Sequence, residues 1–128
     1  MPAMRLLLPL LLAACAGDET VSGYTGTDAT WRLSELHGAP FAPPATLRFP
    51  AEGEVAGEGP CNAFRAPQAE PYPWIRIGPI AATRRACPAL AEERRFFAAL
   101  EAATLAEASD AVLILTDDAG REMVFRRE

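Results

Sequence analysis

Alternating apolar and polar residues predict extended strands in the first half of the chain. Over 30–36, Trp31 and Leu33 fall on one side of an extended segment that ends in a glycine-containing turn. After a pair of prolines the alternation returns over 46–49, and a second turn rich in proline and glycine leads into the extended segment 54–57. The last two segments therefore predict a β-hairpin.

The middle of the chain predicts a corner and then a loop. Glycine and proline precede Cys61 and Asn62, and this mixture of free and restricted backbone favours a tight corner that the side-chain amide of Asn62 braces. The segment 65–73 is interrupted by prolines and predicts a loop. Ile75 and Ile77 then share one side of a further extended segment.

One helix is predicted over 88–103. Pro88 suits the first helical position, and Glu92 and Glu93 follow in the opening turns, where the helix dipole favours negative charge. Apolar residues recur after them at helical spacing. The pattern indicates a helix of about 16 residues.

Two strands close the chain as a hairpin. The segments 112–116 and 122–127 contain runs of apolar residues, and acids, alanine and glycine form a turn between them. The length of 128 residues suits one domain. The order of predicted elements is several strands, one helix and two strands.

The first residues predict an exported lipoprotein. One arginine precedes a short leucine-rich run, which predicts a signal peptide over 1–14 and is too short for a membrane-spanning helix. Two alanines come directly before Cys15, an arrangement that resembles the lipobox of bacterial lipoproteins, so we expect a lipid on Cys15. Ala16 follows instead of aspartate, which favours the outer membrane facing the periplasm over the inner membrane. A flexible tether is expected over 15–28 and the folded domain over 29–128.

Charge argues against nucleic acid as a partner. The 12 basic residues are all arginine, and with 17 acids the formal net charge is −5. Removal of Arg5 with the leader lowers it to about −6. The arginines form scattered pairs, whereas a phosphate-binding surface needs a basic stripe. The expected partners are the membrane, through the lipid, and another envelope protein.

Two cysteines remain after lipidation. In an oxidising compartment we expect Cys61 and Cys87 to form a disulfide. The alternatives are a free buried pair and a metal or redox site. His37 is the only histidine and no second cysteine lies close to either thiol, so a zinc site lacks ligands at suitable spacing. No metal or cofactor is therefore expected.

Taken together, these segments resemble the META domain family, which includes HslJ-like lipoproteins. The resemblance covers nearly the whole predicted domain and depends on the order and spacing of its pieces. The matching motif residues are Trp31, Cys61, Asn62, Thr83 and Cys87, within the segments 30–33, 46–49, 61–64, 83–88, 96–100, 113–115 and 120–125. Ala63, Ala66 and Arg85 depart from the residues common in the family.

The resemblance implies an α+β fold in which an antiparallel sheet curls like a barrel and one helix packs on it. It also implies an association with heat shock, stress response, drug tolerance and the outer membrane. No catalytic activity is established for the family. We therefore expect a non-catalytic module for binding or for envelope maintenance.

Two other functions remain open from the sequence. A curled sheet can enclose a cavity for a small hydrophobic ligand. Its candidate lining residues are Trp31, Phe49, Phe64, Trp74, Phe97 and Phe125. A hydrolase would need a pair of acids or a histidine base. The candidates are Glu52, Glu54, Glu58, Glu92, Glu93, Asp117, Asp118 and His37.

Overall fold

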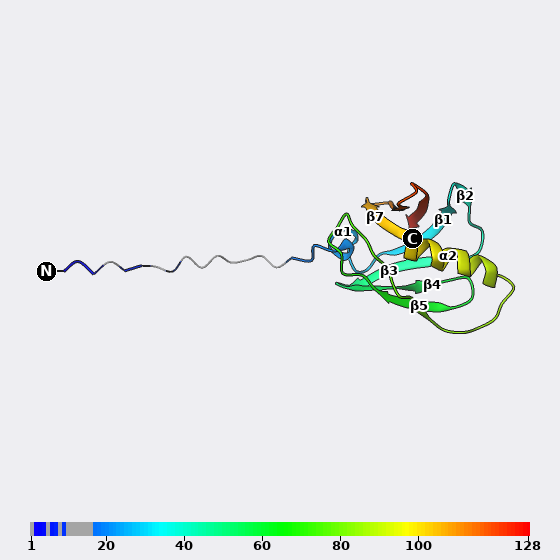
Figure 1. Ribbon diagram of the computed structural model, residues 1–128, viewed down its shortest axis with the longest axis horizontal. Helices are drawn as coiled ribbons and strands as arrows, with labels where there is room; N and C mark the ends of the chain where they lie inside the picture. The colour runs from blue at the N-terminus through cyan, green and yellow to red at the C-terminus, as the bar shows by residue number, and fades with distance from the viewer. Residues whose placement is uncertain (1, 5, 8, 10–16) are drawn as a thin grey trace.

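The fold is a single curled sheet of nine antiparallel strands with one main helix (Figure 1). The computed structural model describes residues 2–4, 6–7, 9 and 17–128. The strands are β1 (Thr30–Leu36), β2 (Ala39–Pro40), β3 (Thr46–Ala51), β4 (Glu54–Glu58), β5 (Ala63–Pro67), β6 (Ala81–Ala82), β7 (Ala103–Ala108), β8 (Val112–Asp117) and β9 (Glu122–Arg127), and the helices are α1 (Val21–Thr25) and α2 (Leu90–Ala102). The strand order is β6-β5-β4-β3-β1-β9-β8-β7, with β2 beside β1. The predicted α+β architecture is confirmed.

The interior of the curl is filled by side chains that alternate along the strands. In β8 every second residue is buried, and β1 and β3 begin with the same alternation, which shifts in β1 at a bulge between Leu33 and Glu35. Phe96 of α2 lies at the centre, where its ring contacts those of Phe41, Phe64 and Phe125. Because Phe64 belongs to β5 and Phe125 to β9, the helix packs between the two halves of the curved sheet.

The main helix is shorter than predicted at its start. Pro88 lies in a turn, and regular helix begins at Leu90. The backbone N–H of Leu90 donates to the carbonyl of Cys87 at 3.2 Å, a three-residue spacing that is tighter than an α-helical turn. The prediction that Pro88 occupies the first helical position is therefore wrong. Pro88 lies in a short turn that leads from Cys87 into α2.

The segment before β1 differs from the predicted tether over 15–28. The carboxylate of Asp18 accepts the backbone N–H of Thr20 at 2.9 Å and also binds the hydroxyl of Ser22. These contacts satisfy donors at the start of α1, whose Val21 and Thr25 are buried. From Asp18 onward the chain is part of the folded domain.

The predicted lipidation site at Cys15 lies outside the described residues. Where the chain is described, neither helix has the length and apolar character that crossing a bilayer requires.

Candidate functional site

The corner between β4 and β5 is tied to the start of α2 by a covalent bond. Cys61 in this corner forms the predicted disulfide with Cys87, and their Cα atoms are 5.7 Å apart. The corner itself is closed by the backbone N–H of Gly59, which donates to the carbonyl of Asn62 at 2.8 Å. The disulfide therefore holds the end of one hairpin against the segment that enters the helix.

Asn62 uses its whole side-chain amide in this corner. Its Nδ2 donates to the carbonyl of Arg85 at 3.1 Å and to Oε2 of Glu93 at 2.7 Å. Its Oδ1 accepts the hydroxyl of Thr83 at 2.9 Å and the backbone N–H of Arg85 at 2.5 Å. An amide offers two donors and two acceptor lone pairs, so this buried group is fully satisfied. The role predicted for Asn62, bracing the corner, is its observed role.

Glu93 completes the arrangement from the helix. Its Oε1 accepts the backbone N–H groups of Cys61 at 3.0 Å and Asn62 at 2.6 Å, while Oε2 accepts the Asn62 amide. The residue is only 3 % exposed, so Glu93 lies in the opening turns of the helix as predicted but is buried there. We call Asn62, Thr83, Arg85, Glu93 and the disulfide the corner cluster.

Four of the five family motif residues meet in this region, and the fifth does not. Cys61, Asn62, Thr83 and Cys87 contribute to the corner cluster. Trp31 lies on β1 with no exposed surface, and within the described part of the chain its indole N–H has no hydrogen-bond partner. The motif therefore marks two structural positions, a braced corner and a buried core ring.

Sequence patterning carried a signal for the burial of Glu93 that the prediction missed. Glu93, Phe96 and Leu100 are spaced by three and four residues, so they share one helix face. Phe96 and Leu100 are both completely buried. An acid on the same face as two core residues has to find donors inside the protein.

Several of the other candidate acids and the histidine lie exposed at turns and strand ends. Glu54 and Glu58 lie exposed at opposite ends of β4, and Glu52 is exposed in the turn before it. His37 lies exposed in the turn after β1 with a positive φ of 51°. Among the described residues there is no group of three or more acids, histidines or cysteines that could hold a metal ion.

Asp117 is fixed in the turn of the closing hairpin. Its Oδ1 accepts the backbone N–H groups of Arg121 and Ala119, each at 2.9 Å, and its Oδ2 accepts Nε of Arg121 at 2.8 Å. The backbone N–H of Arg121 is the main cause that holds the pKa of the Asp117 carboxyl below its usual value, although partial burial opposes it. An acid held in its ionised form is a poor proton donor, and its neighbour Asp118 is exposed.

The aromatic residues predicted to line a cavity mostly fill the interior. Trp31, Phe49 and Phe125 have no exposed surface, Phe64 is 5 % exposed and Phe97 packs partly buried against them. Trp74 departs from this set because it is 56 % exposed at the rim of the sheet. These side chains form the core.

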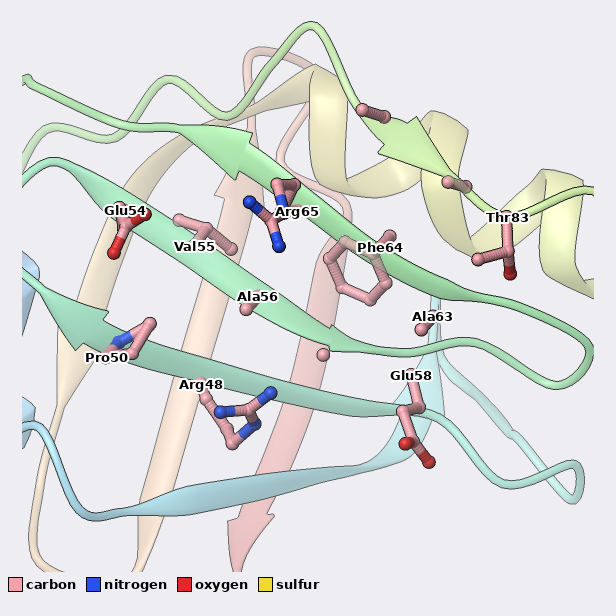
Figure 2. A pocket seen from close by; sticks show the side chains of 13 residues that line it. Arg48, Pro50, Glu54, Val55, Ala56, Glu58, Ala63, Phe64, Arg65 and Thr83 are labelled. Atoms are coloured by element: carbon pink, nitrogen blue, oxygen red, sulfur yellow. The ribbon is translucent and has the colours of Figure 1, made fainter.

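A groove crosses the outer face of the sheet beside the corner cluster (Figure 2). It has a volume of about 520 Å³ and runs over β3, β4, β5 and β6. Arg48 on β3 is paired in register with Ala56 on β4, which is paired with Arg65 on β5. Figure 2 shows the two arginine side chains on either side of Ala56. We call this surface the outer groove.

Basic and acidic residues of the outer groove lie along two crossing directions, the arginines across the strands and the glutamates along β4. Neighbouring strands are about 4.8 Å apart, so the backbones of Arg48 and Arg65 are roughly 10 Å apart across the small side chain of Ala56. Along β4, Glu54 and Glu58 flank Ala56 on the same outer face. Within the described chain, neither arginine takes part in a salt bridge. Two guanidinium groups are thus available to an anion above Ala56, with an acid at each end.

Comparison with known proteins identifies the family. A profile of the META domain matches residues 25–128. A protein from Burkholderia xenovorans, solved by NMR, has a TM-score of 0.64 and 23 % identity, and the match covers 79 % of this chain and 82 % of that one. A crystal structure of a DUF4847 family protein from Bacteroides vulgatus has a TM-score of 0.66 and 14 % identity, with coverage of 83 % and 96 %. Both likenesses concern the fold alone.

No curated protein matches this chain. The family assignment therefore depends on the profile, which spans most of the sequence including the corner cluster and the outer groove. The chain belongs to the META domain family.

Proposed function

We propose that this protein is a lipid-anchored, non-catalytic binding module of the bacterial cell envelope. The leader and the Leu12-Ala13-Ala14-Cys15 sequence support acylation of Cys15, and Ala16 supports an outer-membrane lipoprotein that faces the periplasm. The Cys61–Cys87 disulfide suits an oxidising compartment. Envelope maintenance under stress, which the family resemblance implies, is the role that fits such a module.

The outer groove carries the binding part of the proposal. Arg48 and Arg65 are exposed on β3 and β5, the two strands that flank β4, and the small side chain of Ala56 lies between them. A guanidinium group presents several donors in a plane and binds carboxylates through paired hydrogen bonds. We expect an acidic side chain of a partner protein to lie over Ala56. Glu54 and Glu58 would favour basic residues beside that acid and disfavour a strongly anionic polymer.

A photo-crosslinking experiment in living cells tests this site. A photoreactive phenylalanine analogue at Ala56, on the groove floor, is expected to give a discrete adduct with an envelope protein. Replacing both Arg48 and Arg65 by glutamine is expected to reduce that adduct at least about tenfold, because a charge-assisted contact is worth about 1.5–3 kcal/mol.

The controls use exposed positions on α2. The same analogue at Ala98, which is exposed on the helix, should not give the adduct, and Arg94→Gln should leave the Ala56 adduct unchanged. An adduct that survives the double replacement, or that forms equally from Ala98, would contradict binding in the outer groove.

The remaining functions have less support. A carrier of hydrophobic ligands needs an internal cavity, whereas the aromatic residues of the curl pack against one another. A hydrolase needs two acids free to exchange protons, whereas Glu93 accepts hydrogen bonds inside the corner cluster and Asp117 is bound by the backbone and side chain of Arg121. The proposal of a non-catalytic module follows from this placement.

A further inference from the structure

Large apolar side chains are exposed along the edge strand β7. Trp74 is 56 % exposed, Leu105 is 38 % exposed and Tyr24 is 60 % exposed. Trp74 pairs with Leu105 through an antiparallel bridge, so their side chains project from the same face. Exposed apolar side chains that lie together, rather than singly, often mark a contact with a partner or a membrane.

Hydrogen bonds and stacking hold these residues in fixed positions. The ring of Tyr24 stacks on that of Tyr72, with centroids 4.0 Å apart and an angle of 19°. The hydroxyl of Tyr72 accepts the backbone N–H of Ala108, the last residue of β7, at 3.1 Å. Ala108 lies three residues from Leu105, which is about 10 Å along a strand. The stacked pair of Tyr24 and Tyr72 thus lies near the end of β7, with Tyr72 packed partly against the core, and Trp74 lies beside Leu105 nearer its middle. We call these four residues the aromatic edge.

The N-terminal segment enters the domain at the aromatic edge. The backbone N–H of Tyr72 donates to the carbonyl of Glu19 at 2.7 Å, and α1 lies against β7. Figure 1 shows the chain reaching the domain beside α1 and β7. Five residues of chain separate Cys15 from Thr20, and a chain of that length spans at most about 18 Å.

We propose that the aromatic edge rests on the surface of the phospholipid bilayer to which the protein is anchored. This inference depends on the proposed acylation of Cys15, which would hold α1 within about 18 Å of the membrane. Tyrosine and tryptophan are enriched where a membrane meets water, because their rings are apolar and carry one polar group. The edge orients the domain on the bilayer.

The charge of the protein indicates that this contact is apolar. The chain has a net charge of −5, and Glu19 and Glu107 are exposed near the aromatic edge. Attraction to anionic lipid headgroups would need a basic cluster instead. The contact should therefore persist at high salt, which screens charges but not apolar burial.

Tryptophan fluorescence of the acylated protein in phosphatidylethanolamine and phosphatidylglycerol vesicles tests the inference. The chain has two tryptophans, and Trp31 is completely buried, so a response to the lipid comes from Trp74. Lipids that carry bromine on their acyl chains are expected to quench most of the Trp74 emission, at low and at high salt. Trp74→Phe, which leaves Trp31, is expected to abolish the quenching.

A second variant tests the contribution of Leu105, which pairs with Trp74. Leu105→Ser removes the apolar neighbour of Trp74 and is expected to weaken the quenching severalfold, whereas Ala98→Ser on α2 should leave it unchanged. Quenching that is equal in Leu105→Ser, or a protein that floats with the vesicles while Trp74 remains unquenched, would overturn membrane contact and leave the anchor intact. A native protein that lacks the acyl group and fails to float would overturn both.

Discussion

Replacing Glu93 by glutamine is expected to lower the free energy of unfolding by about 3 kcal/mol, a large share of the total for a domain of this size. Three donors converge on the Glu93 carboxylate, from the backbone of Cys61 and from the backbone and side chain of Asn62. Glutamine keeps the shape but turns one acceptor into a donor, so at least one buried N–H faces another N–H. Denaturant titration measures the change, and a fall in Tm of more than about 10 °C should accompany it.

Glu92 provides the matched control for this variant. It is the preceding residue of the same helix turn and is only partly buried. Glu92→Gln should change the free energy of unfolding by less than about 0.5 kcal/mol. Equal effects of the two replacements would mean that the corner cluster does not hold the helix to the sheet.

Loss of the disulfide is expected to cost about 3.5 kcal/mol. Cys61 and Cys87 are separated by 26 positions. In the chain-entropy description, removing a cross-link over a loop of that length raises the conformational entropy of the unfolded chain and so stabilises it by about 3.5 kcal/mol. The double replacement Cys61→Ser and Cys87→Ser should therefore lower the Tm by more than about 10 °C. Scanning calorimetry with and without a reductant measures the effect.

The reductant supplies the control. It should lower the Tm of the native protein toward that of the double serine variant, and it should leave the variant itself unchanged. A native protein whose Tm does not respond to complete reduction of both thiols would contradict a stabilising role for this cross-link.

Strong alternation made most of the sheet predictable. The strands β1, β8 and β9 lie at their predicted positions, because apolar residues alternate with polar ones at the start of β1, form short runs in β8 and β9, and turns with glycine follow β1 and β8. The positive φ of Gly120, 78°, shows why glycine ends the turn of the closing hairpin. Sequence patterning predicts strands well where each residue faces either the core or the solvent.

The strand β7 was missed because its residues favour a helix. The segment Ala103–Ala108 is rich in alanine and follows α2 directly, so the predicted helix extended into its first residue. It forms a strand because it pairs with β8 over most of its length. This pairing in the folded protein outweighs the helical propensity of its residues. The strand β5 was also missed, since its prolines predicted a loop over 65–73.

The candidate site was predictable only in part. Cysteine pairing follows from number and compartment, which is why the disulfide was expected, and the brace at Asn62 follows from its neighbours. The outer groove could not be foreseen, because Arg48, Ala56 and Arg65 come from three strands and only the register of β3, β4 and β5 brings them into one row.

Mass spectrometry of the native mature N-terminus tests the central claim, that the domain is tethered to a membrane from outside the cytoplasm. The result we predict is a chain that begins at Cys15 and carries a diacylglyceryl thioether on that residue, with the thiols of Cys61 and Cys87 oxidised. A chain that retains residues 1–14, or one that begins at Cys15 with a free thiol, would contradict it.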